Sequence, residues 1–409
     1  MNFVPMREVV RFAIGGGWGS ETEVDGSVLT RVIRGADFPE AAEQNLTNAP
    51  LRWEKESRVK TRALAAGDIV LEISGGTKDR PTGRTVLVTQ KMVDESVSPL
   101  IPASFCRKVQ ISREIADPKF VYYWLQLMHK SGRAWKHQNQ STGIANFQFE
   151  QFLDNEFLWL PSLTTQQAIA SILGSLDDKI AANNDVVSAS NELIRNLYRA
   201  LPESSRTLNE VASLAKNNEQ PHRFLPDKRL VGLEHFDPKS LWLPRSSEPE
   251  TATSAKTKFQ AGDTLFGKLR PYFHKVAIAP FDGYCSTDIL VLRAENPLHS
   301  PLVAAAANSD AVVQQAVNSS NGTRMPRAKW TDIEGCPIPD PDAPATLEFI
   351  DFAATLIQDA TARLEENKAL AKTRDELLPL LMSGKITVRE ASQEAAAAGA
   401  QIPSEENEV

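Results

Sequence analysis

The chain has 409 residues, of which 42% are hydrophobic and 24% charged, and its formal net charge is −7. These values suit a globular protein of two or three domains and exclude a disordered or collagen-like chain. No apolar run reaches the roughly 18 residues of a membrane span, no secretory signal opens the chain, and three scattered cysteines form no CxxC pair, so we expect a cytoplasmic protein with reduced thiols, without a zinc site and without a membrane partner.

Residues 1–157 are predicted to form a first globular domain. Its glycine-rich stretch 15–19 contains Trp18, which can stack on a base or a sugar, although a plain tight turn is the alternative. The stretch is no phosphate-binding loop, because neither GxGxxG nor GK[ST] follows. Residues 66–73 predict a turn and a buried strand, with a second strand at 85–89. Between the strands lies a loop with Lys78, Arg80 and Arg84.

The second part of this domain, residues 119–157, is predicted to contain a helix and a cluster of polar side chains, and the start of the next helix follows it. Residues 119–135 predict a helix with a largely apolar buried face. A cluster of amide and hydroxyl side chains follows: Gln138, Asn139, Gln140 and Thr142. The apolar segment 158–160 and Pro161 are then typical of the start of a helix.

Residues 158–206 are predicted to form a long spacer helix. Between 164 and 201, apolar residues alternate at spacings of three and four, which leaves one narrow stripe for a partner helix. The principal seam residues are Ile169, Leu173, Leu176, Ile180, Asn183, Val187, Ile194 and Leu197. A buried Asn in such a seam lowers stability but fixes the register.

Residues 207–340 repeat the pattern of the first domain. Gly262-Asp263 corresponds to Gly67-Asp68, and both pairs precede a strand and a basic segment. The candidate contact residues of the second basic segment are Lys268, Arg270, Tyr272, His274 and Lys275. Residues 319–324 stand where the amide cluster stood, and they add Asn321, Thr323 and Arg324, with Arg327 shortly after.

Residues 341–388 predict a second spacer helix with a matching seam. Its seam residues include Ile350, Ile357, Leu364, Asn367, Leu378 and Leu381. An offset of 184 residues superimposes the two seams and brings Asn367 onto Asn183, so we expect the helices to pack antiparallel with these amides in register. Residues 389–409 are acidic and have little apolar mass, so we expect them to be disordered.

No set of residues predicts catalysis. Asp68 and Glu72 suggest a nuclease, but no Glu-x-Lys follows them, and the six histidines show no HxxxH spacing. The pairs 177–178 and 365–366 are expected to be solvated helix faces. Most of the negative charge lies in the two helices and the tail, whereas the globular segments are slightly basic or neutral, which permits DNA binding without requiring it.

The combination of these features resembles the specificity subunits of type I restriction–modification systems. The resemblance covers residues 1–388 and rests on the duplicated domain-plus-helix plan, on 158–173 with Pro161 and Gln166-Gln167, and on 176–184, 262–273 and 377–386. Residues 340–344 depart from the family pattern at the second helix start. The resemblance implies an α/β (α+β) fold with two similar target-recognition domains joined by two long antiparallel coiled-coil helices, in an internal pseudo-twofold repeat.

The resemblance also implies a function and partners. A non-catalytic subunit of this kind reads a bipartite, asymmetric site in double-stranded DNA. Two modification subunits on the helices methylate adenine, and restriction subunits translocate and cut; the partners, not this chain, bind S-adenosylmethionine, ATP and magnesium. Two other hypotheses stay open, a scaffold whose coiled coil recruits proteins and a stand-alone nuclease. The salt dependence of duplex binding separates the DNA reader from the scaffold.

Overall fold

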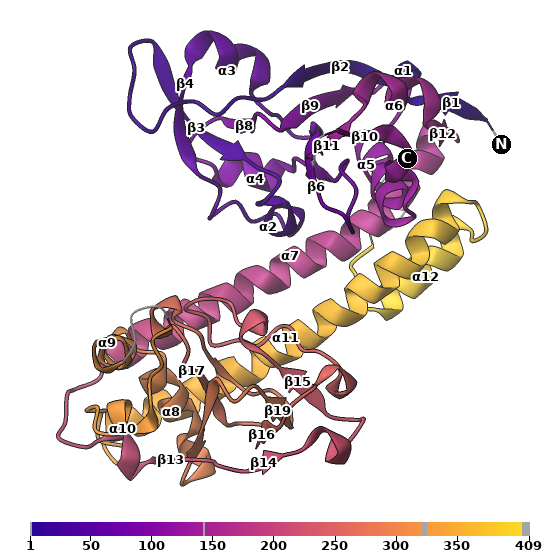
Figure 1. The fold of residues 1–409 in the computed structure, drawn as a ribbon. Coiled ribbons are helices and arrows are strands. Elements are labelled where there is room, and N and C mark those ends of the chain that lie inside the picture. The colour runs from indigo at the N-terminus through magenta and orange to yellow at the C-terminus, as the bar shows by residue number, and fades with distance from the viewer. Residues whose placement is uncertain (1, 142–143, 321–324, 403–409) are drawn as a thin grey trace. The chain divides into compact units, whose positions relative to one another are not determined.

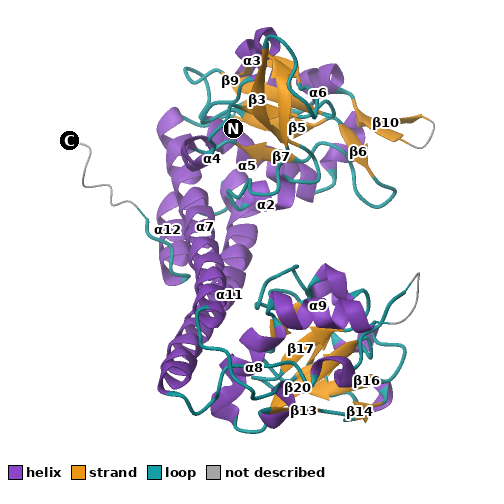
Figure 2. Ribbon diagram, turned by 90° about the vertical axis from the view of Figure 1, so that its left-hand side faces the viewer, coloured by secondary structure: helices purple, strands orange, loops and turns teal. Residues whose placement is uncertain are grey.

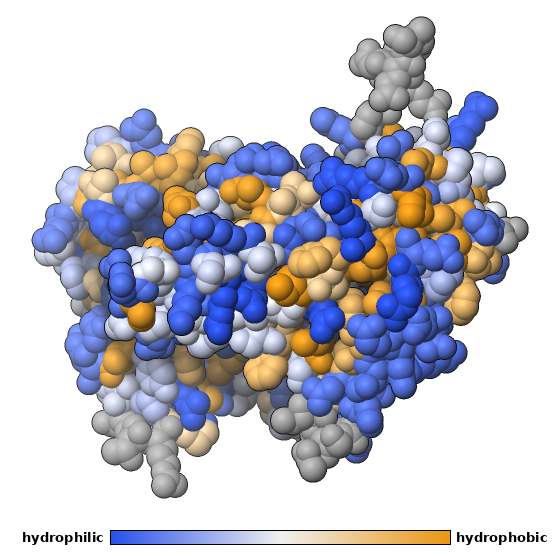
Figure 3. All heavy atoms as spheres, turned by 90° about the horizontal axis from the view of Figure 1, so that it is seen from above, coloured by the Kyte–Doolittle hydropathy of each residue, from blue (hydrophilic) through white to orange (hydrophobic). Residues whose placement is uncertain are grey.

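The computed structural model describes residues 2–141, 144–320 and 325–402. The chain forms two compact units (Figure 1). Unit 1 consists of residues 1–182 and 366–409, and unit 2 of residues 183–365. None of the described helices combines the length and the apolar character that a bilayer crossing needs. On the face drawn in Figure 3, apolar side chains are interspersed among many hydrophilic ones.

The main sheet of unit 1 is antiparallel, with the strand order β2-β9-β5-β7. These strands are β2 (Val10–Gly15), β9 (Cys106–Ile111), β5 (Ile69–Glu72) and β7 (Thr85–Leu87). A second sheet has the order β4-β3-β8, with β4 (Leu51–Lys55), β3 (Ser27–Ile33) and β8 (Leu100–Pro102). Smaller ladders join β10 (Gln138–Ser141), β11 (Ile144–Phe147) and β6 (Ser74–Gly76), and β1 (Phe3–Pro5) with β12 (Phe157–Trp159).

Helix α5 (Pro118–Lys130) fills the core of unit 1. It starts where Asp117 caps the backbone N–H of Phe120 at 2.9 Å, and it buries Phe120, Tyr123 and Met128. The helix predicted for 119–135 is interrupted, because Gly132 adopts a φ of +77° and a 3-10 turn, Arg133–His137, follows. The short helices of unit 1 are α1 (Met6–Val9), α2 (Phe38–Ala42), α3 (Glu56–Arg62), α4 (Gln90–Glu95) and α6 (Phe149–Asn155).

Unit 2 repeats the main sheet in the order β13-β20-β17-β18. These strands are β13 (Ala212–Leu214), β20 (Ile289–Ala294), β17 (Thr264–Gly267) and β18 (Val276–Ile278). The second sheet, β14-β16-β19-β15, contains β14 (Asn218–Glu219), β16 (Lys256–Phe259), β19 (Gly283–Cys285) and β15 (Arg229–Val231). Each second sheet contains one parallel pair, β3–β8 and β15–β19. Helix α8 (Ser300–Ala307) is buried on nearly all sides, and α9 (Asp310–Ser319) and α10 (Trp330–Ile333) follow it.

The two predicted long helices are present as α7 (Leu163–Arg199) and α11 (Pro344–Met382), and the boundary between the units falls inside both. In unit 1, Arg374 Nη1 donates to Asp177 at 2.6 Å and Lys179 lies 3.6 Å from Glu366. As the residue number rises along α7, the residue number of the contact on α11 falls, so the two segments run antiparallel. Unit 2 shows the same direction.

The seam residues lie in the cores of their own units. In unit 1 the buried ones are Ile169, Leu173, Leu176, Ile180, Leu378 and Leu381; in unit 2 they are Asn183, Val187, Ile194 and Ile350, with Leu197, Ile357 and Leu364 partly buried. Asn183 Oδ1 accepts a hydrogen bond from Arg363 Nη1 at 3.0 Å. The pairing of Asn183 with Asn367 across the seam stays a prediction.

The prediction that all of 389–409 is disordered is wrong for its first part. Residues Val388–Ala397 form helix α12, which begins with a capping box between Thr387 and Glu390. The buried face consists of Ala391 and Ala395, which join the hydrophobic core of unit 1. Alanines bury little area each, but at a spacing of four they let a helix approach its neighbours closely. Residues 403–409 lie outside the described part of the chain.

Candidate nucleic-acid interface

The Gly-Asp step builds the same turn in both units. Gly67 and Gly262 adopt φ values of +91° and +88°, a region in which other residues are strained. The carboxylate of Asp68 lies 3.1 Å from Lys108, and that of Asp263 lies 2.6 Å from Arg293. In each case the basic partner comes from the neighbouring strand of the main sheet, so these aspartates stabilise the turn.

In unit 1 this turn leads to a basic loop that rests against the predicted amide cluster. Strand β6, which begins the loop, pairs with β11 of the hairpin β10–β11. Farther along the loop, the backbone N–H of Thr82 donates to Gln138 Oε1 at 3.0 Å. Lys78 and Asn139, both exposed, therefore belong to one contiguous surface element.

Two of the three predicted cations of this loop are engaged inside the protein. The carboxylate of Glu72, almost fully buried, accepts from Arg80 at 2.9 Å and from Arg84 at 2.5 Å and 3.0 Å. Arg84 also donates to the backbone oxygen of Gly35 and lies over the ring of Phe38. Arg84 is thus a structural residue, and Arg80 keeps its side chain about one-third exposed.

Trp18 lies in a loop in which close packing against the backbone requires glycine at positions 16 and 19. A side-chain carbon at Gly16 would lie 2.1 Å from the backbone oxygen of Pro102. The indole is 40% exposed, and the guanidinium of Arg52 sits 4.7 Å from its centroid. One face of Trp18 is therefore occupied by a cation–π contact, which leaves part of the ring accessible.

Unit 2 brings its two predicted segments together in the same way. Leu269 and Arg327 form an isolated antiparallel bridge. The backbone N–H of Arg270 donates to Pro326 at 2.8 Å, and that of Ala328 donates to Lys268 at 3.0 Å. The basic segment after β17 is thereby fixed against the segment after α9.

The exposed part of this second surface is basic and aromatic. Arg270 has a left-handed backbone (φ +52°), and within the described residues no acidic side chain pairs with it. Tyr272 is 53% exposed and its ring lies 4.8 Å from that of Phe273. Arg327 donates to Asp288 at 3.0 Å, and Lys275 donates to the backbone oxygen of Leu233 at 2.7 Å. Arg270 and Tyr272 are the most available of the predicted contacts.

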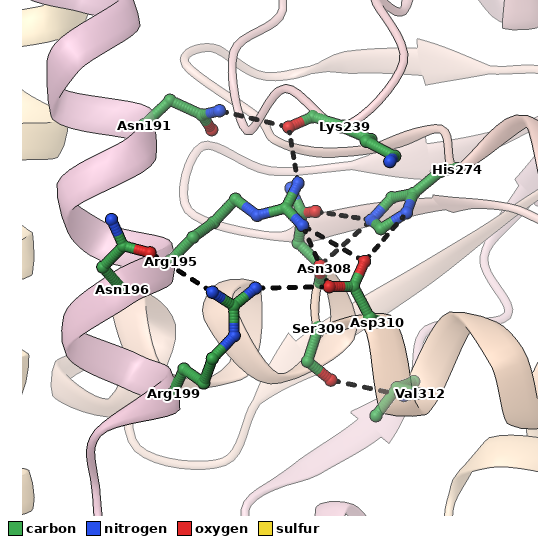
Figure 4. A network of polar contacts seen from close by, with 10 residues as sticks. All are labelled: Asn191, Arg195, Asn196, Arg199, Lys239, His274, Asn308, Ser309, Asp310 and Val312. Atoms are coloured by element: carbon green, nitrogen blue, oxygen red, sulfur yellow. Dashed lines mark hydrogen bonds and ion pairs between the residues drawn. The ribbon is translucent and has the colours of Figure 1, made fainter.

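His274 is not available for contact, which contradicts the prediction. Its ring is buried, and Nε2 lies 2.8 Å from Oδ1 and 3.0 Å from the backbone oxygen of Asn308. Asp310, 3.8 Å from Nδ1, is held by Arg195 and Arg199 of α7 (Figure 4). Desolvation lowers the pKa of His274 below its usual value, although the bonds to Asn308 oppose this. The ring joins the base of the loop to α9.

Of the acidic pair 177–178, Asp177 is largely shielded from solvent, which corrects the prediction, whereas Asp178 is exposed as predicted. Asp177 accepts hydrogen bonds from Tyr123 Oη and from Arg374, both at 2.6 Å, and Asp178 accepts from Gln44 at 2.9 Å. Across residues 2–141, 144–320 and 325–402, no three His, Cys, Asp or Glu side chains gather in a way that would hold a metal ion. Burial raises the pKa of the Cys106 and Cys285 thiols to about 12, so neither is a ready nucleophile.

Some predicted residues cannot be placed. Thr142, Asn321, Thr323 and Arg324 lie outside the described residues, and Gln140 is described only as part of β10. Conversely, Phe273, 45% exposed beside Tyr272, was not predicted. The adjacent aromatic pair after Pro271 is the signal in the sequence that could have indicated it.

Residues 53–188 match the sequence profile of the type I restriction modification DNA specificity domain. A curated relative, the EcoDI specificity subunit of a type I restriction enzyme from Escherichia coli, is 27% identical over 189 residues. This part of the chain is therefore similar to type I specificity subunits. The match spans 44% of this chain and 41% of the EcoDI subunit's own length.

One solved structure of a specificity subunit shows the same fold. A type I restriction–modification S subunit from M. genitalium has 13% identity to this chain and a TM-score of 0.57, covering 93% of this chain and 95% of its own. The HsdS subunit of Thermoanaerobacter tengcongensis has 12% identity and a TM-score of 0.30, with coverage of 97% and 96%. The first match supports the mixed helix-and-sheet fold with two long helices.

Proposed function

We propose that this chain is a type I specificity subunit, a non-catalytic reader of a bipartite, asymmetric site in double-stranded DNA. Each unit reads one half-site, and partner subunits carry out adenine methylation or cleavage. The observation behind the proposal is that one chain contains the same construction twice, a main sheet of the same order, a Gly-Asp turn, and a basic segment fixed against a polar segment. The exposed side chains of the two copies differ, as the reading of two different half-sites requires.

The side chains on these surfaces suit contacts to a duplex. Lys78 can place its positive charge against a phosphate. Such a contact changes the affinity for all DNA sequences alike. Asn139 and Arg270 can form paired hydrogen bonds to base edges, typically to adenine and guanine. Tyr272 and Trp18 offer aromatic faces for a base or a sugar. Phosphate contacts set the register and the amide and guanidinium groups supply discrimination.

The long helices are proposed as the spacer and the platform for partners. At about 1.5 Å per residue, a helix the length of α7 extends roughly 55 Å. Two modification subunits and the restriction subunits join the chain in this proposal, and they supply the sites for S-adenosylmethionine, ATP and magnesium. Linking two weak readers raises their joint affinity through effective concentration.

Exchanging one domain tests the proposal. Residues 1–157 are replaced by those of another specificity subunit, the chain is expressed with its modification subunits, and the methylated sequence is read by sequencing. Only one half of the recognised sequence is expected to change. The matched exchange of residues 207–340 should change only the other half. A change in both halves, or in neither, contradicts independent reading.

A scaffold that binds no DNA is the second candidate, favoured by the exposed apolar residues on the long helices, among them Leu193 and Phe352. Duplex affinity of the assembled complex at several salt concentrations decides between them. A DNA reader loses affinity steeply as salt increases, because each neutralised phosphate releases counterions. Absence of salt-dependent duplex binding would favour the scaffold.

A further inference from the structure

The last main-sheet strands in chain order, β9 and β20, are equivalent at an offset of 183 residues. Gln110 of β9 and Arg293 of β20 each bond the aspartate of their Gly-Asp turn. The backbone N–H groups of Ser112 and Glu295 each donate to the residue just before the first strand of their sheet. This offset therefore identifies which residues of the two following helices, α5 and α8, correspond to each other.

At this offset, three large aromatic side chains of α5 are replaced by alanines in α8. Both helices have a proline in the first turn, Pro118 and Pro301. Residues 122–124 are Tyr, Tyr and Trp, whereas the matching residues 305–307 are all Ala. Helix α8 lies between the main sheet of unit 2 and the long-helix segments of that unit (Figure 2). Smaller side chains at this place leave interior space that neighbouring elements would have to fill.

Beside Ala305 the space stays open as a cavity of about 360 Å³. Its wall is formed by the end of α7 and the residues after it, by the start of α9 and by the segment 337–339, all within unit 2. Tyr198, Leu201 and Ile338 make much of this wall apolar. A cavity of this size with a mostly apolar wall is typical of sites for small organic molecules.

Hydrogen-bond donors gather in the wall where α9 begins. Arg195 and Arg199 of α7 share the single carboxylate of Asp310, at 3.1 Å and 3.3 Å (Figure 4), so two positive charges face one negative charge. The backbone N–H groups of Asp310 and Ala311, in the first turn of α9, have no acceptor within the helix. The side chain of Arg199 is 64% exposed and is available to a bound anion.

The buried Asn308 adds a donor without a partner. The residue is 1% exposed, and its Oδ1 lies 2.8 Å from His274 Nε2. Its Nδ2 has no hydrogen-bond partner among the described residues. An unpaired buried donor destabilises a folded protein unless an acceptor satisfies it. Asn308 also lines the cavity, so a bound molecule with an oxygen acceptor is favoured there.

We infer that this cavity binds a small organic molecule with a compact apolar body and a single negative charge, such as a carboxylate or a sulfonate. The apolar wall takes the body, and Arg199 and the first turn of α9 take the anion. Exposed Glu203 also lines the cavity and disfavours a second negative charge on the ligand. The site goes beyond the proposed function and does not rest on it, because the residues predicted to contact DNA are not among those that line the cavity.

Two dyes that differ only in the charged group test the site in the full-length chain. Anilinonaphthalene sulfonate carries one negative charge, and phenylnaphthylamine is the same ring system without the sulfonate. Fluorescence titration and calorimetry are expected to give one sulfonate dye bound per chain. Arg199→Gln should weaken binding of the sulfonate dye roughly tenfold and leave that of the neutral dye unchanged. Arg223→Gln, at an exposed arginine of unit 2 outside the cavity, is the matched control.

Filling the cavity tests its location. Ala305→Tyr introduces the side chain that unit 1 has at the matching position, and it should abolish binding of both dyes. Ala311→Trp, at an exposed residue of the cavity wall, should do the same and serves if the first variant does not fold, as checked by circular dichroism. Gln314→Trp, at an exposed residue of α9 outside the cavity wall, is the control and should change nothing.

Three results overturn the site. They are failure of the sulfonate dye to bind the unaltered chain, binding that persists in a folded Ala305→Tyr or Ala311→Trp variant, and an equal effect of Arg199→Gln on both dyes. The titration is repeated with the modification subunits present. Loss of the dye site in that complex would show that a protein contact covers the cavity and would overturn the choice of a small molecule.

Discussion

The basic loops of the two units differ in one residue that decides what their cations do. In unit 1, β5 ends with Glu72, whose buried carboxylate holds Arg80 and Arg84. Aligned on the Gly-Asp turns, the equivalent residue in unit 2 is Gly267. With no carboxylate at that place, Arg270 has no acidic partner among the described residues. Similar sequence patterns thus produce an internal ion-pair cluster in one unit and an exposed cation in the other.

This comparison shows that a basic segment is not by itself a binding surface. A guanidinium already bonded to a buried carboxylate would have to exchange that partner for DNA. Breaking a buried ion pair leaves an unpaired charge inside the protein, and this costs more free energy than the new contact supplies. Contacts in unit 1 are therefore expected from Lys78 and the amides of the hairpin, and in unit 2 from Arg270 and its aromatic neighbours.

The largest expected effect comes from shifting the helices out of phase. Two extra residues after Val187 and two after Ala371 break the heptad alternation, and assembly with partner subunits should be lost. Seven residues at each place keep the phase and lengthen each helix by ~10 Å. The non-specific spacer between the two half-sites of the recognised sequence should then widen by about three base pairs at ~3.4 Å each, with both half-sites unchanged. Sequencing of the methylated sites measures this, and an unaltered gap after the in-phase insertion would exclude the helices as the spacer.

Removing the carboxylate that distinguishes the loops should destabilise unit 1. Glu72→Gln leaves Arg80 and Arg84 without their charge partner, and loss of one member of a buried pair typically costs ~3 kcal/mol or more. Urea unfolding measures the loss. Asp79→Asn, at an exposed residue of the same loop, is the control and should be neutral. Equal stability of the two variants would mean that the cluster does not hold the loop.

Arg270→Ala should weaken duplex binding by ~1–3 kcal/mol if the guanidinium reads a base edge, with unfolding unchanged. Arg80→Ala should affect binding less and stability more, because its guanidinium is bonded to Glu72. Filter-binding or anisotropy on the assembled complex measures affinity, with exposed Arg223→Ala as a control. A larger loss of duplex affinity for Arg80→Ala than for Arg270→Ala would contradict the conclusion that Arg270 is the more available cation.

The smallest expected effect is on the pH dependence of unit 2. The pKa of His274 is lowered in the folded protein by desolvation, so the unfolded state binds more protons between the folded value and the ordinary value of about 6.5. Stability should therefore fall as the pH drops below about 6.5, while Asn308, Asp310 and Arg195 surround the ring. His274→Gln should flatten this slope in urea titrations, and exposed His222→Gln should not. An unchanged slope for His274→Gln would contradict this assignment.

The sequence predicted the large features because they depend on periodic patterns. The heptad spacing gave both long helices, and the repeated Gly-Asp step located two equivalent turns whose glycines need a positive φ. Pairings between distant residues were not predictable. Nothing near Arg84 in the sequence indicates that Glu72 forms an ion pair with it. By its sequence context His274 is expected in an exposed loop, because its hydrogen bond to the distant Asn308 appears only in the structure.

The tail shows a different kind of miss. Composition suggested disorder after residue 388, because alanine counts little in an apolar sum. In the folded protein, Ala391 and Ala395 are fully buried in the core of unit 1, and the Thr387–Glu390 capping box defines the helix start. The capping motif was legible in the sequence and would have corrected the prediction.

The division of the long helices has a consequence for the order in which the protein is made. Unit 2 is continuous in sequence, whereas unit 1 needs residues from 366 onward to complete its core. A ribosome therefore releases all of unit 2 before the last helical segments of unit 1 exist. Synthesis of unit 1 thus begins first but is completed last. Until residues from 366 onward have been made, the apolar face of α7 at Leu173 and Leu176 has no partner from α11.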